Sequence, residues 1–245
     1  MPLPIEQRTK FFVFVIESPS APDLYHRRSE GDVISQAVGL NGIHCVVKTA
    51  ISLEAFNACL KVGISEEMQK FPGFMPLLHI SAHGNSDGIQ LSDGYMMTWV
   101  ELKEYLRPIN QALGGSLIVC MSSCEGYSGI RMVMDKNAID HPYFALIGCS
   151  KKPTWGETAV AYATFYHQLS RGEFINDATE AMRIASGNRC FFLEHSENTH
   201  KTFVEFLSSR ESQDAIENLE KIVENESPEN KNLLKNLLNS SSNIS

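Results

Sequence analysis

The sequence has no apolar stretch long enough to cross a membrane and no cluster of basic residues. Its longest apolar runs, residues 11–16 and 117–121, are far shorter than the roughly 20 residues that a spanning helix needs. The N-terminus lacks the basic and then apolar segments of a secretory signal, so we expect a cytoplasmic protein. With 29 acidic and 21 basic residues the net charge is −8, which disfavours nucleic acids and membrane surfaces as partners.

Metal and cofactor motifs are also missing, because no C-x-x-C or H-E-x-x-H pattern occurs. His79 and His83 are four residues apart, and the same spacing separates Cys120 from Cys124. Four residues of an extended strand span about 13 Å, so neither pair can bind one metal ion. The consecutive glycines Gly114 and Gly115 precede a strand-like run, whereas the glycines of a phosphate-binding loop follow a strand. We therefore expect no metal and no cofactor.

Cysteines are few for a disulfide framework. The chain has six, without an export signal, and we interpret them as reduced thiols. We assign structural roles to Cys45, Cys59, Cys149 and Cys190, with the role of Cys149 the most open because it ends a strand-like run.

Apolar runs alternate with segments of helical periodicity along the first 190 residues. Continuous apolar runs are typical of strands buried on both faces, and their alternation with helices predicts βαβ crossovers. We therefore expect an α/β fold, a three-layer α/β/α sandwich with five or six strands in a mainly parallel sheet. Residues 88–94 alternate apolar and polar and end in Asp-Gly, which predicts a small hairpin. The expected strands are residues 10–17, 44–48, 77–82, 116–121 and 143–148, and the expected helices 31–40, 53–71, 99–113, 157–169 and 176–186.

The composition changes after residue 206. Residues 211–245 hold seven acidic and three basic residues, which is a net −4 of the chain's −8. Two amphipathic stripes, at 216–223 and 233–238, predict a helical hairpin followed by a polar tail. We expect a main domain at 1–206 and this acidic helical appendage at 207–245. The appendage is either a solvated hairpin packed on the domain or a regulatory or docking element.

Two of the expected strands end in residues that could react. One runs into His83-Gly84, and another runs into Cys124-Glu125-Gly126. If these strands are neighbours, the thiol and the imidazole face each other, as nucleophilic acyl transfer requires. Backbone N–H groups of Gly84 and Cys124 could then polarise the attacked carbonyl. The alternative is two buried or incidental residues without a common role.

These segments resemble the caspase-like cysteine peptidases, and among them the CHAT family, which includes separase-like proteases. The resemblance rests on His83-Gly84, on Ser123-Cys124-Glu125-Gly126 41 residues later, and on Trp155-Gly-Glu-Thr-Ala159, and it extends over residues 10–190. It implies a caspase-like fold and a dyad without an obligatory acid. In this dyad Cys124 is the nucleophile and His83 the acid–base.

The resemblance also bears on specificity. Ser122 and Ser123 depart from the caspase pattern before the nucleophile, so the caspase preference for Asp is not carried over. In separase-like relatives an acid near the Trp-containing loop binds a basic side chain, and Glu157 stands in the corresponding stretch. Glu157 could equally cap the helix that it begins. Asp87, after His83, is a second candidate for substrate binding.

Three functional hypotheses follow. The first is an endopeptidase that cleaves a protein substrate and is regulated by an activating partner or ligand. Residues 18–29 and 126–142 are the segments expected to move, and the resemblance suggests a role in prokaryotic defence or cell death. The second is a non-catalytic scaffold or signal-binding module that docks through the acidic appendage. The third is a thiol hydrolase acting on a small amide or ester.

Overall fold

The computed structural model describes residues 10–209, and the helical hairpin expected at 211–245 lies outside them. The expected boundary after residue 206 falls in the last turn of the final described helix. The strands are β1 (Phe11–Ser18), β2 (Cys45–Thr49), β3 (Met75–Asn85), β4 (Gly88–Gln90), β5 (Met96–Thr98), β6 (Ile118–Ser122), β7 (Ala145–Cys149) and β8 (Phe191–His195). The helices are α1 (Ala21–Tyr25), α2 (Glu30–Gly39), α3 (Leu53–Ala58), α4 (Ile64–Lys70), α5 (Trp99–Ala112), α6 (Trp155–Ser170), α7 (Ile175–Ser186) and α8 (Ser196–Ser208).

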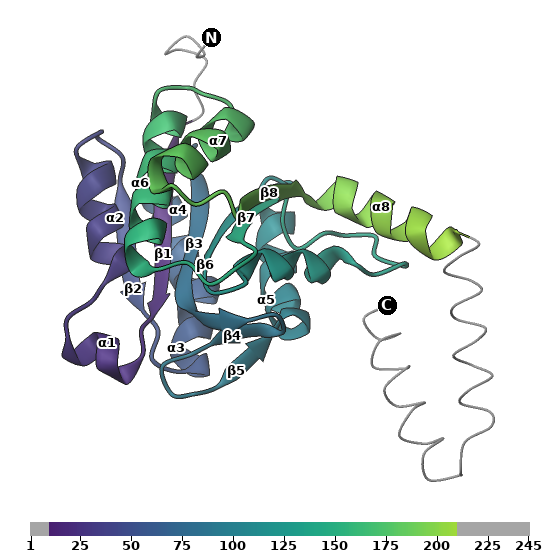
Figure 1. Ribbon diagram of the computed structural model, residues 1–245, viewed down its shortest axis with the longest axis horizontal. Helices are drawn as coiled ribbons and strands as arrows, with labels where there is room; N and C mark the ends of the chain where they lie inside the picture. The colour runs from purple at the N-terminus through teal and green to yellow at the C-terminus, as the bar shows by residue number, and fades with distance from the viewer. Residues whose placement is uncertain (1–9, 210–245) are drawn as a thin grey trace.

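The main sheet has the order β2-β1-β3-β6-β7-β8 (Figure 1). The neighbours from β2 to β7 are all parallel, and β8 is antiparallel to β7. The predicted hairpin is confirmed, since β4 pairs with the end of β3 and with β5. β8 is a strand that the apolar runs did not predict. The single helix predicted over residues 53–71 is divided into α3, a π-helical turn η2 (Cys59–Gly63) and α4.

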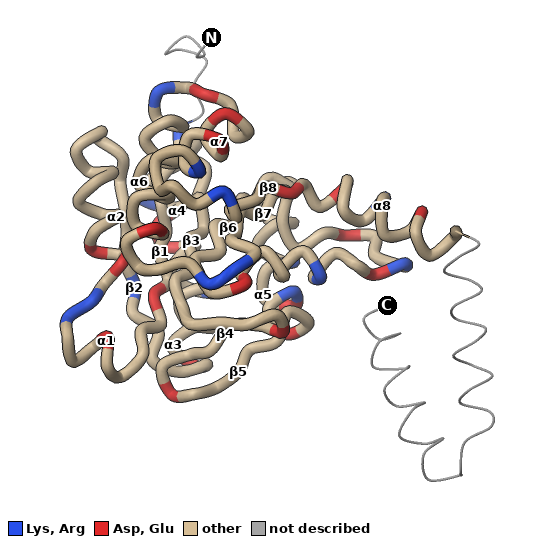
Figure 2. Tube along the Cα trace, viewed as in Figure 1, with Lys and Arg blue, Asp and Glu red and all other residues tan. Residues whose placement is uncertain are grey.

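The core has two halves, one on each face of the sheet, and alternating side chains of β1 contribute to both. Phe12, Phe14 and Ile16 pack with α3, α4 and α5, whereas Val13 and Val15 pack with α2, α6 and α7. Helices therefore cover both faces of the sheet (Figure 1), and the predicted three-layer sandwich with a mainly parallel sheet is confirmed. Acidic and basic positions are interspersed along the described chain (Figure 2). Among residues 10–209, no helix is both long and apolar enough to span a bilayer.

Candidate active site

β3 and β6 are neighbouring parallel strands, so their carboxyl ends lie at the same edge of the sheet. Their last paired residues are Ser81 and Ser122, and His83 and Cys124 each follow two residues later. Both line one small cleft with a volume of about 60 Å³. The other residues lining it are Ala82, Ser122, Ser123, Pro153, Trp155 and Thr158. The structure thus brings together the two residues that the sequence analysis singled out.

Gly84 packs directly against the segment that carries the cysteine. A methyl group at Gly84 would lie 3.1 Å from the carbonyl oxygen of Cys124 and 2.9 Å from that of Gly88. Only a residue without a side chain allows this approach without displacing backbone. Gly84 is therefore the packing contact between the end of β3 and Cys124.

His83 is oriented by a carboxylate that the sequence analysis did not identify. Its Nε2 lies 3.0 Å from Oδ2 of Asp23, and its ring meets that of Trp155 edge to face at a centroid distance of 6.2 Å. The Asp23 side chain is 5% exposed and that of His83 is 44% exposed. Because Nε2 is engaged by Asp23, Nδ1 is the ring nitrogen available for exchanging a proton.

Asp23 belongs to α1, which follows β1 after a short connection. Ser20 caps this helix and its hydroxyl also donates to the Asp23 carboxylate, while Arg28 lies 3.7 Å from Oδ1. Burial alone would raise the pKa of Asp23, but hydrogen bonds from Ser20 and His83 together with the His83 charge lower it. The carboxylate is thus kept ionised. The sequence contains a weak signal for this role of Asp23. Asp23 comes three residues after Ser20, and both follow β1, the strand that pairs with β3.

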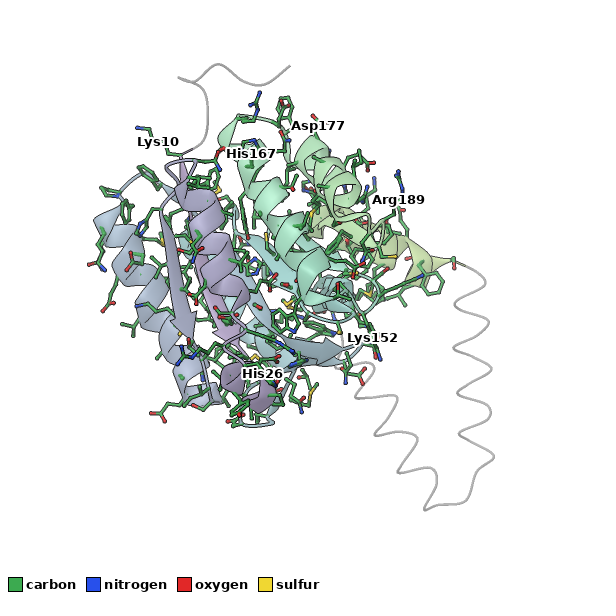
Figure 3. The ribbon with its side chains drawn as sticks, turned by 60° about the vertical axis from the view of Figure 1, so that its left-hand side comes forward. Lys10, His26, Lys152, His167, Asp177 and Arg189 are labelled. Atoms are coloured by element: carbon green, nitrogen blue, oxygen red, sulfur yellow. The ribbon has the colours of Figure 1, made fainter. Side chains whose placement is uncertain are left out.

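Cys124 sits at the start of a strained turn. The next residue, Glu125, has the left-handed φ of 56°, which is uncommon for a residue with a side chain, and its N–H donates to the carbonyl of Lys151 at 2.8 Å. Burial raises the pKa of the Cys124 thiol, the charge of Lys152 opposes this and that of Glu125 adds to it. Figure 3 shows Lys152 and His26 at one end of the molecule and Lys10 and His167 at the other.

Two polar groups of the cleft are without partners in the described chain. The N–H of Cys124 donates to no protein acceptor among residues 10–209. The buried hydroxyl of Ser123 also has no partner there. Gly126 makes room for this turn, because a methyl group at that position would lie 2.7 Å from the Ser123 oxygen and 2.8 Å from the Met121 carbonyl. These unpartnered groups could hydrogen-bond a bound carbonyl.

Glu157 and Asp87 lie outside the cleft lining. Glu157 forms a capping box at the start of α6, where its Oε2 accepts from the Thr154 N–H at 2.6 Å and its Oε1 from Asn188 Nδ2 at 3.3 Å. Asp87 is 75% exposed, in the turn between β3 and β4, and its Oδ1 lies 3.5 Å from Arg131. Their proposed contacts with substrate remain predictions.

Three of the remaining cysteines, Cys45, Cys120 and Cys149, are poorly suited to nucleophilic chemistry. All six cysteines are free, and Cys120 and Cys149 are buried. Burial raises the pKa of Cys120 to about 12 and those of Cys149 and Cys45 to about 11. Among the described residues no cluster of three or more His, Cys, Asp or Glu side chains could hold a metal ion.

A scan against models of known protein families finds no match, and a search of curated proteins finds none either. Among solved structures, the chain is similar to the Arg-specific cysteine proteinase gingipain R (RgpB), at 13% identity and a TM-score of 0.44 over 74% of this chain and 45% of that one. It is also similar to the complex of the pro- and mature domains of RgpB from Porphyromonas gingivalis, at 12% identity and a TM-score of 0.47 over 77% of this chain and 50% of that one. The chain thus spans about half the length of each of these two structures.

Proposed function

We propose that the protein is a cysteine endopeptidase with Cys124 as its nucleophile and His83 as its general acid–base. The observation that carries this proposal is the common cleft of Cys124 and His83, in which Nε2 of the imidazole is held by the buried carboxylate of Asp23. The caspase-like motifs in the sequence support the same assignment. With Asp23 included, the site has the three groups of a nucleophile, its base and the residue that orients the base.

The geometry suggests a sequence of proton transfers. The Cys124 sulfur attacks the substrate carbonyl carbon while its proton passes to Nδ1 of His83. The imidazolium, stabilised by Asp23, then gives this proton to the leaving amine as the peptide bond breaks. Water attacks the resulting thioester, His83 takes up its proton, and the departing thiolate recovers that proton. The N–H of Cys124, with that of Gly84 as the expected second donor, would stabilise the oxyanion.

The resting thiol is protonated at neutral pH, because burial raises its pKa. Attack and proton transfer to His83 would therefore occur together, rather than from a preformed thiolate. The segment 18–29 carries Asp23, so its movement would change how His83 is held. We propose that an activating partner or ligand acts on this segment and on residues 126–142, and that the enzyme is a regulated effector of the kind suggested by the CHAT resemblance.

The proposed preference for a basic residue before the cut depends on Glu157. We expect Glu157→Gln to reduce cleavage after Arg and Lys by about tenfold or more if this carboxylate binds the substrate, because a charge-assisted contact would be lost. Cleavage after neutral residues should not change. Rates on matched peptides that differ only in that residue would measure this. Equal losses on both peptides would assign Glu157 to capping of α6 alone.

The test of the proposed function is digestion of a proteome-derived peptide library by the wild type and by Cys124→Ala and His83→Ala. We expect new N-termini in the wild-type sample and none with either variant. A substrate series of increasing length should favour long peptides, whereas equal turnover of small amides would indicate the small-molecule hydrolase. Cleavage by Cys124→Ala at the wild-type rate would rule out the mechanism. Partner binding and full effect in that variant would favour the scaffold.

A further inference from the structure

A buried carboxylate lies beneath the cleft and takes no part in the proposed proton transfers. Glu30 is the first residue of α2, and its side chain is 1% exposed. Its Oε2 accepts a hydrogen bond from the Ser81 hydroxyl at 2.6 Å. The Ser122 hydroxyl lies 2.9 Å from Oε1 and 2.8 Å from Oε2. One carboxylate therefore binds a serine from each of the two strands that lead to the candidate active site.

The positions of these serines connect Glu30 to the dyad. Ser81 and Ser122 are paired with each other in the register of β3 and β6. Each precedes a functional residue by two positions, so Ser81 and His83 project from the same face of β3. Ser122 also lines the cleft. Glu30 thus fastens the two strands together at the last pair before His83 and Cys124.

The charge of Glu30 is accommodated by its surroundings. Burial would raise the pKa of this carboxyl, but His79, Ser81 and Ser122 together lower it. Nε2 of His79 lies 3.7 Å from Oε2, too far for a hydrogen bond, and Nδ1 is 2.9 Å from the Tyr166 hydroxyl. Glu30 also lies at the N-terminus of α2, where negative charge is favoured. Buried ionic groups of this kind add little net stability compared with apolar packing.

We propose that Glu30 is a positioning residue, which holds Ser81 and Ser122 so that His83 and Cys124 meet in the geometry that proton transfer requires. This role rests on the proposed Cys124 and His83 mechanism. Displacing reacting groups by about 1 Å can cost on the order of 10²-fold in rate. The substitution Glu30→Gln keeps the shape of the side chain but replaces one carboxylate oxygen with an NH₂ group. In the wild type the hydroxyls of Ser81 and Ser122 donate to the carboxylate, and an NH₂ group cannot accept these hydrogen bonds.

The experiment compares two labels at Cys124. One is a set of acyloxymethyl ketone peptides that differ in the residue next to the ketone, in which the cysteine sulfur displaces the acyloxy carboxylate and the thiol proton leaves with it. The other is iodoacetamide, which needs neither the oxyanion donors nor His83. Mass spectrometry measures the rate of each label at Cys124, and the ratio of the two rates corrects for changes in thiol exposure.

We expect Glu30→Gln to lower the ratio of ketone to iodoacetamide labelling by about tenfold or more, within the range that misplacement produces. Ser122→Ala should lower it as well, and Ser122→Thr should retain it because the hydroxyl is kept. In the double variant of Glu30→Gln with Ser122→Ala, the labelling ratio should be no lower than in the more affected single variant, as expected for residues that act as one unit.

A matched control is Glu67→Gln in α4. Glu67 is also a buried carboxylate, 4% exposed, but it binds Lys70 and His44 and has no contact with Ser81 or Ser122. The Glu67→Gln variant should be less stable than the wild type but should have the same ratio of ketone to iodoacetamide labelling. If Glu30→Gln also keeps the ratio while His83→Ala lowers it, the positioning role is refuted and the dyad stands. If no ketone labels wild-type Cys124, or His83→Ala has no effect, the proposed function fails and the role of Glu30 fails with it.

Discussion

The two edges of the sheet differ in the volume of their cavities and in the residues that line them. At the carboxyl edge, His83 and Cys124 share a cleft of only about 60 Å³. At the amino edge, the ends of α5, β7 and β8 enclose a hollow of about 620 Å³, lined among others by His141, Tyr143 and His195. The larger hollow has no cysteine in its lining. Volume alone would select the amino edge, whereas the rule that ligands bind at the carboxyl ends of parallel strands favours the edge where we propose the active site.

The histidines of the two edges are held differently. Nε2 of His83 is bound by Asp23. His141 has its ring 5.2 Å from that of His200, and its buried Nδ1 has no partner among the described residues. Burial lowers the pKa of His141, and the neighbouring His200 lowers it further. Of these two histidines, only His83 has its imidazole oriented by an acid, and the following predictions test whether this difference governs activity.

The largest expected effect comes from removing the nucleophile or the base. Cys124→Ala and His83→Ala should each lower peptide cleavage by about 10³-fold or more, because no other group can take over their roles. At the amino edge, His141→Gln should leave the rate unchanged. Rates on a library-derived peptide, with circular dichroism to verify folding, would measure this. A loss of activity in the His141 variant as large as that in the Cys124 variant would contradict the proposal that the active site lies at the carboxyl edge.

Asp23→Asn should have the next largest effect, a loss of about 10²-fold to 10⁴-fold in cleavage rate. The amide cannot stabilise the imidazolium and changes the tautomer that His83 adopts. The variant should also change the dependence of stability on pH. Because the pKa of Asp23 is lowered by folding, its contribution is present above the unfolded value near 4 and is lost as the pH falls through the folded value.

Urea unfolding between pH 3 and pH 7 would measure this contribution. The stability difference between the wild type and Asp23→Asn should shrink as the medium becomes more acidic. A difference that does not vary with pH would mean that the carboxylate is not held in its charged form. Activity equal to the wild type would show that His83 needs no orienting acid, as the dyad expected from the sequence implies.

The sequence predicted the five parallel strands of the main sheet, though not β8, and it singled out His83 and Cys124, because both predictions depend on local pattern. Apolar runs lead directly into His83 and Cys124, and parallel neighbours place their ends together. Asp23 was not predicted, because its contact with His83 joins residues 60 positions apart through a turn of α1. Glu157 was ambiguous for another reason. A Thr-x-x-Glu pattern at a helix start is compatible with a capping residue and with an exposed acid. In the folded protein both carboxylate oxygens of Glu157 accept hydrogen bonds.

Gly84→Ala should have a moderate effect, destabilising the protein by about 1–3 kcal/mol, since the added methyl group meets the backbone carbonyls of Gly88 and Cys124. The amino-edge control is Gly39→Ala in α2, where nothing lies within 4 Å of the added methyl group. It should be neutral or stabilising by up to about 1 kcal/mol, because Ala favours the helix. Chemical denaturation of both variants measures the two values. Equal stabilities would show that Gly84 does not pack tightly against Cys124.

The smallest effect concerns the charges around the thiol. Lys152 lowers the pKa of Cys124 and Glu125 raises it, so Lys152→Gln should raise this pKa and Glu125→Gln should lower it. Lys103→Gln, which removes a charge beside His141 at the amino edge, should leave it unchanged. The pH dependence of iodoacetamide labelling at Cys124 measures all three.

Both shifts should diminish at high salt, because Lys152 is exposed and Glu125 is only half-buried. Burial, the largest cause of the raised pKa, should persist in every variant and at every salt concentration. Labelling that levels off near pH 7 in the wild type would instead mean that His83 already holds the proton in the resting protein. The carboxyl edge would then contain a preformed ion pair, and no movement of residues 18–29 would be needed to make Cys124 reactive.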